Sequence, residues 1–246
     1  TKELCADYFP KNNIFSLLDT PIFINGQLKG IVCFEQIEKI KNWDNEDIAF
    51  ARAITDLLVI AIESQLRIDS ERKLVYKSEL LSAMVMCTDK FINTKEKIDI
   101  FREAFPIIGK VTKVDHLYYY ENDPSTNLFR QKYKWGRENV ELQITPLRYF
   151  SHDDFKEIVE KAAKRKSLKS HTRELNEGVL KKLLIDNQIK SILIFPLYAK
   201  ENFTGFVGLD VIDAERKWSD DEINTLQILS SNIASSIERL DNESEI

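Results

Sequence analysis

Aromatic side chains with polar tips are concentrated in one short stretch of the chain, which reads His-Leu-Tyr-Tyr-Tyr. If this stretch is a β-strand, His116, Tyr118 and Tyr120 lie on one face, and Leu117 and Tyr119 lie on the other. Flat rings that carry hydroxyl groups can stack on a planar ligand and hydrogen-bond to its edges. The stretch therefore predicts either one wall of a ligand pocket or an aromatic core beneath covering helices.

The cysteines could provide a second kind of chemistry. Cys5, Cys33 and Cys87 are an odd number without the spacing of a metal site. A thiol that reduces a substrate must be accessible, must have a low pKa and must have a resolving partner. Cys33 lies within an apolar run, which favours a buried and inert thiol. This use of cysteine is typical of a reduced, cytoplasmic protein, and that is the localisation we expect.

These residues are carried by a chain whose two ends repeat one another. Four landmarks near the start recur in the same order, each 175 residues later. They are Ser16, Pro21, Gly30 and Trp43, matched by Ser191, Pro196, Gly205 and Trp218. A repeat of this kind predicts two copies of one domain type, the first of them without its front half.

Each copy ends with the same series of elements. Strands are expected at 17–24, 28–34, 191–198 and 204–211. The turns between them contain Asn25-Gly26 in the first copy and Glu201-Asn202 in the second. A tryptophan and a capped helix follow, and apolar residues at spacings of three and four give each helix a face that must be buried. These residues are Ile48, Ala51, Ile54, Leu58 and Ile62 in the first copy and Ile223, Leu226, Leu229, Ile233 and Ile237 in the second.

The second copy also contains the elements that precede this ending. Periodicity predicts a helix over 95–113 that kinks or ends near Phe105, because Pro106 cannot donate a backbone hydrogen bond. The other expected elements are strands at 116–121, 128–135 and 141–147 and helices at 151–165 and 177–187. Runs of strands with helices grouped between them predict an α+β fold built on an antiparallel sheet.

One long helix is expected to join the two copies. No proline or glycine occurs between Asn45 and Phe91, so an uninterrupted helix of ~70 Å is the simplest prediction. Its middle, 67–73, is mostly polar, and apolar residues are dense on either side. Such a helix cannot bury its faces within one domain. This favours a parallel dimer through the helix over a solvated connector whose ends pack on their own domains.

The repeated ending resembles that of the GAF domain, a family of small-molecule and chromophore sensing modules in signalling proteins. The resemblance is carried by Ser191-Ile-Leu-Ile-Phe-Pro-Leu, Gly205-Phe-Val-Gly-Leu and Trp218-Ser-Asp-Asp-Glu-Ile, and in the first copy by Ser16-Leu-Leu-Asp-Thr-Pro-Ile, Gly30-Ile-Val-Cys-Phe and Trp43-Asp-Asn-Glu-Asp-Ile. It implies an antiparallel sheet flanked by helices, with one partial and one complete copy joined by a long helix. The domains would be the back half of a first GAF-like domain at 1–64, a connecting signalling helix at 65–91 that continues from about 45, and a complete second domain at 92–240.

The resemblance also implies a ligand pocket under helices and loops on one face of the sheet. The candidate ligand-binding residues are Tyr118, Tyr120, Trp135, Phe155, His171 and Phe195. The ligand and any cofactor stay open. Relatives that bind cyclic nucleotides carry an Asn-Lys pair where this chain has Ile212-Asp213, and relatives that bind bilins attach them through a cysteine, which the second copy lacks after Cys87.

Composition limits the partners that we expect. A net charge of −5 argues against nucleic acid, and no apolar run reaches the ~18 residues of a membrane-spanning helix. The sequence thus predicts a non-enzymatic sensory or regulatory module that binds an unidentified small molecule and forms a homodimer through its long helices. The family implies an output domain outside this chain, such as a histidine kinase or a diguanylate cyclase. The alternatives are a structural dimerisation module with a closed pocket, and a thiol-dependent enzyme like the methionine sulfoxide reductases, which would use Cys5 and Cys33.

Overall fold

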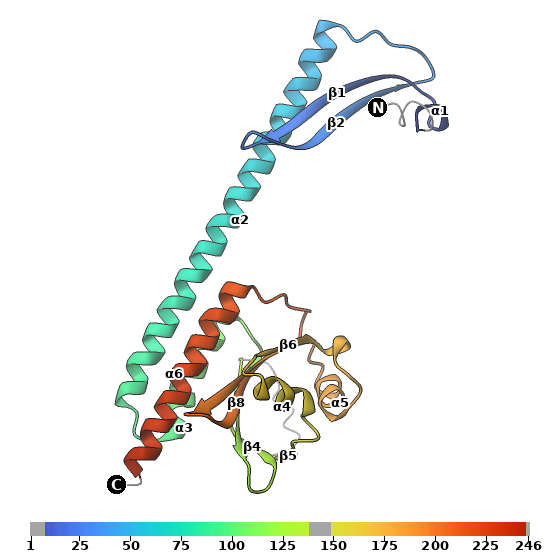
Figure 1. Cartoon of the computed structure of the whole chain (residues 1–246). Helices are drawn as coiled ribbons and strands as arrows, with labels where there is room; N and C mark the ends of the chain where they lie inside the picture. The colour runs from blue at the N-terminus through green and yellow to red at the C-terminus, as the bar shows by residue number, and fades with distance from the viewer. Residues whose placement is uncertain (1–7, 138–148, 245–246) are drawn as a thin grey trace. The chain divides into compact units, whose positions relative to one another are not determined.

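A computed structural model of the chain describes residues 8–137 and 149–244. The chain forms two compact units, Thr1–Leu74 and Val75–Ile246, and each contains its own β-sheet (Figure 1). The sheet of the first unit has two strands and that of the second has six.

The first unit is a β-hairpin followed by the start of a long helix. Its strands are β1 (Ile14–Ile24) and β2 (Gln27–Ile37), preceded by the one-turn helix α1 (Phe9–Lys11). The strands pair antiparallel through a turn at Asn25 and Gly26. The φ angles of these two residues are 50° and 74°, which are the positive values that an Asn-Gly hairpin turn needs. Both expected strands are present, and each extends up to three residues further than the alternation predicted.

The long helix α2 (Asn45–Asn93) is continuous, as the absence of proline and glycine predicted. Asp44 caps it, since its Oδ1 accepts hydrogen bonds from the backbone N–H groups of Glu46 and Asp47 at 2.9 and 2.8 Å. The hydroxyl of Thr55 in α2 hydrogen-bonds to that of Thr20 in β1 at 2.5 Å. Neither α2 nor any other helix in the part of the chain that the structure describes is long and apolar enough to cross a membrane.

Only part of the expected apolar face of α2 is buried. Ala51 is buried and Ile54 is half-buried, but Leu58 and Ile62 are 41% and 37% exposed. The matching residues of the terminal helix in the second unit, Leu226, Leu229, Ile233 and Ile237, are all buried. The expectation of a buried face is therefore right for the second copy and wrong for the later turns of the first. The reason is that a two-stranded hairpin covers less helix than a six-stranded sheet.

The second unit is built on an antiparallel sheet with the strand order β5-β4-β3-β8-β7-β6. The strands are β3 (His116–Asp123), β4 (Leu128–Gly136), β5 (Tyr149–Ser151), β6 (Leu168–His171), β7 (Ser191–Ala199) and β8 (Asn202–Val211). The β7–β8 hairpin is the counterpart of β1–β2. Its turn lies at Lys200 and Glu201, one residue earlier than expected.

Helices cover both faces of this sheet, and each face has its own apolar core (Figure 1). The helices are α3 (Lys97–Thr112), α4 (Lys156–Ala163), the 3₁₀ turn η2 (Thr172–Glu174), α5 (Val179–Asp186) and α6 (Asp220–Ser244). On one face α3, α6 and the end of α2 pack over Leu117 and Tyr119. On the other face α4 and α5 pack over Tyr120 and Phe206. This architecture confirms the α+β class predicted from the sequence.

The helices expected at 95–113 and 151–165 differ from the structure, and the second of them, α4, begins at Lys156 because Ser151 lies in strand β5. Helix α3 continues through Pro106 to Thr112 and does not end near Phe105. Pro106 lies on the exposed side of α3, so the missing hydrogen bond falls where water can replace it, while Phe101 and Phe105 stay buried. The strand expected at 141–147 lies outside the described residues. The short strands β5 and β6 were not predicted, because three or four residues carry too little alternation.

Candidate functional site

A cavity of about 80 Å³ lies between the sheet of the second unit and the helices α4 and α5. Its lining is mostly apolar, with a small set of polar residues. The aromatic members are Tyr118, Tyr120, Phe150, Phe155 and Phe206, and the polar members are Gln131, Lys134, Asn187 and Asp210. An apolar chamber with a few placed polar groups is the usual form of a small-molecule site.

Strand β3 sends its aromatic side chains alternately to the two faces of the sheet. Tyr118 and Tyr120 contact the cluster under α4 and α5, whereas Tyr119 packs in the core under α3 and α6. The ring of Tyr120 stacks on that of Phe206, with centroids 5.1 Å apart. Gly208 lies opposite Tyr118 in the β3–β8 register, and a Cβ there would lie 2.0 Å from the tyrosine ring. The absence of a side chain at Gly208 is therefore what allows Tyr118 to lie over β8.

Asp210, one of the polar residues that line the cavity, is held by a buried histidine. Asp210 Oδ1 lies 2.8 Å from His116 Nδ1, and the two side chains are 2% and 5% exposed. Burial raises the pKa of Asp210, and the hydrogen bond from His116 opposes that rise. Lys134 of β4 lies opposite Tyr118 in the register, and burial lowers the pKa of its amine. A carboxylate and an amine thus meet the same small cavity in surroundings where charge is costly.

Two other lining residues share a neutral hydrogen bond. The hydroxyl of Tyr120 donates to Gln131 Oε1 at 2.9 Å. Burial raises the pKa values of both Tyr118 and Tyr120, so the two phenols stay protonated at physiological pH. They can offer hydrogen bonds to a ligand, but they do not carry charge.

The cysteines and histidines do not form a reactive or metal-binding group in the described residues. No set of three or more His, Cys, Asp or Glu side chains there could hold a metal ion. Cys33 is exposed and not buried as expected, because the hairpin that carries it is covered on one side at most. A hydrogen bond with Asp19 raises the pKa of Cys33, and burial raises the pKa of Cys87 to about 12. A reductase thiol needs a lowered pKa, so neither suits that reaction. Cys5 lies outside the described residues.

Comparisons with known proteins find similarity to one domain family. Residues 4–62 match the family model of the GAF domain. Solved GAF domains align over more of the chain than the first unit contains, so the second unit has a GAF-like fold. The phycoerythrobilin-bound GAF domain from a cyanobacterial phytochrome gives a TM-score of 0.58 at 15% identity, covering 68% of this chain and 98% of that one. The GAF domain of a phosphoenolpyruvate-protein phosphotransferase from Coxiella burnetii gives 0.56 at 8% identity, covering 69% and 99%.

A curated relative adds information from sequence. The methanogenesis regulatory histidine kinase FilI of Methanothrix harundinacea (strain 6Ac) is 27% identical over 190 residues, which is 74% of this chain. The chain spans 20% of the length of that relative.

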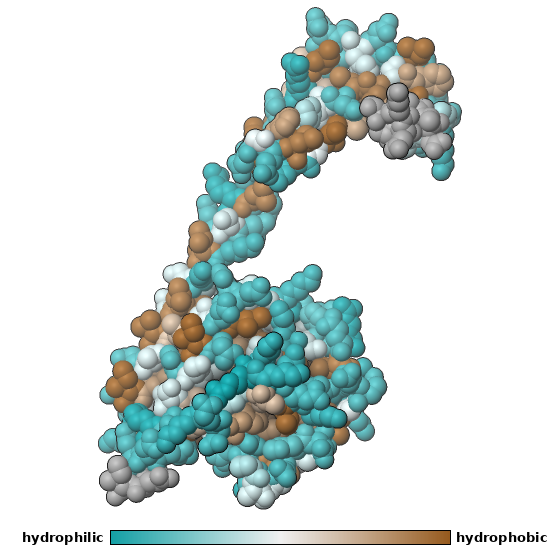
Figure 2. Space-filling model, in the orientation of Figure 1, coloured by the Kyte–Doolittle hydropathy of each residue, from teal (hydrophilic) through white to brown (hydrophobic). Residues whose placement is uncertain are grey.

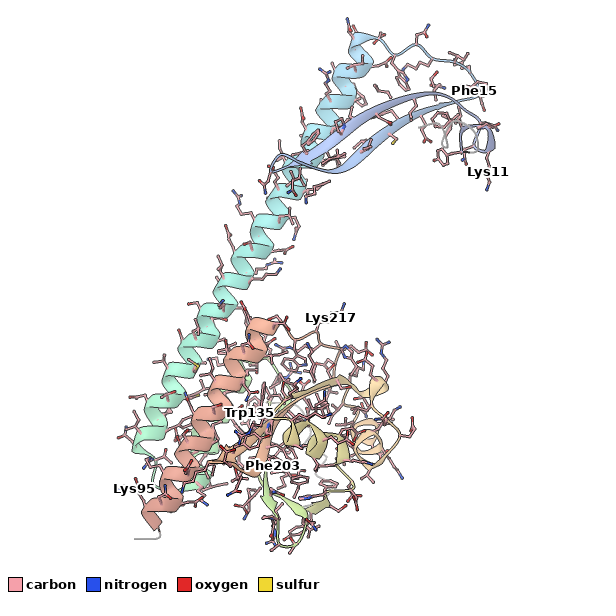
Figure 3. The ribbon with its side chains drawn as sticks, viewed as in Figure 1. Lys11, Phe15, Lys95, Trp135, Phe203 and Lys217 are labelled. Atoms are coloured by element: carbon pink, nitrogen blue, oxygen red, sulfur yellow. The ribbon has the colours of Figure 1, made fainter. Side chains whose placement is uncertain are left out.

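The structure brings together three of the six candidate pocket residues of the GAF-like unit. Tyr118, Tyr120 and Phe155 line the cavity. Trp135, labelled in Figure 3, and Phe195 lie on the opposite face of the sheet, in the core under α3 and α6. Trp135 pairs with Leu117 across β3 and β4, and paired residues share a face. His171 lies at the edge strand β6, where its Nδ1 is 3.0 Å from Ser191 Oγ, and it does not line the cavity.

The polar residues of the cavity were not anticipated. Asp210 had a visible signal, since it is the only charged residue in the apolar strand β8. Lys134 and Gln131 had none, because β4 also carries Arg130 and Lys132, which pair with acids and do not line the cavity. Which of these lines a cavity depends on the register of β4 with β3, including the irregularity between Tyr119 and Tyr120.

Proposed function

We propose that this chain is a sensory module of a signalling protein, in which the second GAF-like unit binds a small molecule. The cavity with its buried Asp210 and adjacent Lys134 is the observation that carries the proposal. The similarity to a regulatory histidine kinase supports a kinase as the output domain. The 175-residue repeat and the GAF match at 4–62 support a tandem of two GAF domains joined by α2.

The cavity limits the chemical class of the ligand. A volume of about 80 Å³ lies between the ~30 Å³ share of one liquid water and the ~150 Å³ of a cavity that holds benzene. The ligand is therefore a molecule of a few non-hydrogen atoms. Its apolar part packs on Tyr120 and Phe206, and its polar end donates a hydrogen bond to Asp210 and accepts one from Lys134. A larger molecule requires α4 and α5 to move away from the sheet.

Transmission follows from the position of the sheet. One face of the sheet lines the cavity, and the other face packs against α6 and the end of α2. A ligand shifts the helices only if it binds one arrangement of these layers more tightly than another. Signal transfer is thus a population shift of helices that share a core with the ligand site.

Binding is tested by thermal shift and native mass spectrometry of the full chain with a defined panel of amino acids, amides, amines and hydroxy acids. The panel is restricted to compounds with about eight or fewer non-hydrogen atoms. We expect at least one compound to bind, and Lys134→Met and Asp210→Asn to weaken it about 10- to 100-fold, because each removes a charged hydrogen-bond partner. Lys132→Met is the matched control, since Lys132 lies in the same strand, pairs with Glu121 and does not line the cavity. An affinity that is unchanged in the Lys134→Met and Asp210→Asn variants would show that the ligand binds elsewhere. No binding would favour the structural dimerisation module.

We also propose that α2 pairs with α2 of a second copy in a parallel dimer. Figure 2 shows apolar side chains spread along this helix. Every large apolar side chain of α2 that is more than 60% exposed falls on one heptad seam, in steps of seven, three or four residues or their sums. These residues are Phe50, Leu57, Ile60, Leu74, Val85 and Ile92. The middle of the seam is polar, with Arg67 and Glu71 in successive layers. In a parallel pair each Arg67 can therefore reach the partner's Glu71.

Disulfide trapping tests this pairing and its direction. Ser78 occupies the seam between Leu74 and Val85, so Ser78→Cys in a chain whose native cysteines are replaced should cross-link to its own copy. Glu79→Cys, one residue further, points away from the seam and should not. Equal cross-linking at both positions, or a monomer by light scattering, would contradict the parallel dimer.

A further inference from the structure

A cation, a tryptophan and an acid form a cluster in the first unit. The backbone N–H of Lys41 donates to Ser16 Oγ at 2.8 Å. Lys41 Nζ lies 4.6 Å from the centroid of the Trp43 ring and 2.6 Å from Asp47 Oδ1. The loop after the hairpin is thereby tied to both the start of β1 and the start of α2.

The second unit repeats this cluster contact by contact. The backbone N–H of Arg216 donates to Ser191 Oγ at 2.8 Å. The guanidinium carbon of Arg216 lies 4.2 Å from the centroid of Trp218, and Nη2 lies 2.6 Å from Glu222 Oε1. Each of these four residues is 175 positions after its counterpart. The same contacts at one offset make the cluster part of the repeated domain ending.

The acid has the same place in both helices. Asp47 and Glu222 are the third residues of α2 and α6, and their backbone N–H groups donate to the capping side chains Asp44 and Ser219 at 2.8 and 3.2 Å. An acid in the first turn is favoured by the positive end of the helix dipole. The cation therefore binds the end of the helix that leaves each domain.

Among the described residues, only the second cluster reaches further helices. Arg216 Nη2 also donates to the hydroxyl of Tyr76 in α2 at 3.3 Å, and Nη1 donates to the carbonyl oxygen of Thr112 at the end of α3. The Tyr76 hydroxyl in turn donates to Glu222 Oε1. The Glu222 side chain is 5% exposed, whereas Asp47 in the first unit is 25% exposed. A guanidinium has the several fixed donors that these contacts need, and the single ammonium of Lys41 does not.

We infer that Arg216 couples the helix that enters the second GAF-like domain to the helix that leaves it. The same guanidinium hydrogen-bonds to the first turn of α6 and to Tyr76 in α2. A movement of one helix therefore changes the hydrogen bonds of the other. This route does not pass through the cavity. It extends the proposed function, because a movement of α2 can be passed to α6 whether or not a ligand is bound.

The Lys77–Asp221 ion pair, at 2.9 Å, also joins α2 to the first turn of α6, and two contacts further along the helices lie outside the coupled region. Asn232 Nδ2 donates to Thr88 Oγ1 at 3.2 Å, and Arg239 donates to the carbonyl oxygen of Phe91 at 3.0 Å. These contacts are at least ten residues away along both helices and do not involve Arg216. Segments that contain them serve as internal references in the same experiment.

Hydrogen exchange of the full chain tests the inference without any ligand. The Arg216→Lys variant keeps the positive charge but loses the several N–H donors of the guanidinium. Amides in 73–80 and in 220–226 should both exchange about tenfold faster or more in this variant. Amides around Thr88, Asn232 and in β8 should be unchanged. Arg165→Lys is the matched control, because Arg165 also lies over a ring, that of Tyr198 at 4.7 Å, and pairs with Glu201, but contacts neither helix.

The two segments decide between coupling and local capping. Faster exchange in 220–226 alone would show that Arg216 only caps α6, and no change in either segment would show that its contacts are not stabilising. Both results overturn the inference. Lys134→Met should leave both segments unchanged, so failure of the ligand proposal and failure of the coupling proposal are distinguishable.

Discussion

Substitution of Asp210 separates the charge of the cavity carboxylate from its hydrogen bond. Asparagine keeps an acceptor 2.8 Å from His116 Nδ1 and removes the charge, so the unfolding free energy at pH 7 should stay within about 1 kcal/mol of the parent value. Alanine leaves Nδ1 without its partner in a site where Nε2 also has none among the described residues. Leaving a buried polar group without its partner costs about 1–3 kcal/mol.

The same substitution tests the sign of a pH dependence. Burial raises the pKa of Asp210 above its ordinary value of 3.8. A group whose pKa is raised on folding contributes stability that is complete below its unfolded pKa and is lost as the pH rises through the folded pKa. Asparagine does not titrate. The unfolding free energy of Asp210→Asn minus that of the parent should therefore increase from about pH 4 upward and level off above the folded pKa.

Urea unfolding between pH 4 and pH 8, followed by tryptophan fluorescence, measures both effects. His116, Tyr118 and Lys134 also face this carboxylate. Repeating the comparison in a His116→Gln background removes the contribution of the imidazole. A difference that does not vary with pH, or an asparagine variant as unstable as the alanine variant, would refute the account of a buried carboxylate at the cavity.

Two further predictions concern packing. Gly109→Ala should lower the unfolding free energy by about 1–3 kcal/mol, because its Cβ would lie 2.1 Å from the Trp135 ring. Gly178→Ala is the control, since its Cβ meets open space and it should cost less than about 1 kcal/mol. Equal losses in urea unfolding would contradict the contact between α3 and β4. Cys87 is fully buried with its pKa raised to about 12, so a thiol reagent should modify it only as fast as the second unit opens, while the exposed Cys33 reacts in the folded protein. Rapid labelling of Cys87 at pH 7 would be inconsistent with that core.

The elements with strong local signals could be predicted from the sequence. The Asn25-Gly26 turn, the helix from Asn45 to Asn93 and the strand that begins at His116 each depend on local backbone preferences, and each is present. The path of α3 through Pro106 could not be predicted, because it depends on which side of the helix faces solvent. The exposure of Leu58 and Ile62 likewise depends on how far the hairpin reaches along α2.

The candidate site was predicted less well, for a related reason. Strand alternation correctly placed Tyr118 and Tyr120 on one face, but it could not show which face of the sheet contains the cavity. Trp135 and Phe195 are aromatic and lie in β4 and β7 of the same sheet, yet they pack under α3 and α6. The strand pattern and the family resemblance suggested aromatic residues for the pocket, whereas the polar groups of the cavity include the less conspicuous Lys134 and Asp210.

The Arg216 cluster could have been predicted from the internal repeat. Identity at the 175-residue offset reveals Ser16 with Ser191 and Trp43 with Trp218, but it passes over Lys41 with Arg216 and Asp47 with Glu222. These pairs keep their chemical class and change their residue type. The change is informative, because the lysine binds the start of one helix, whereas the arginine contacts three helices, α6, α2 and α3. Comparing the copies by charge as well as by identity would therefore have located the cluster, and its one arginine would have pointed to the copy in which it reaches a second helix.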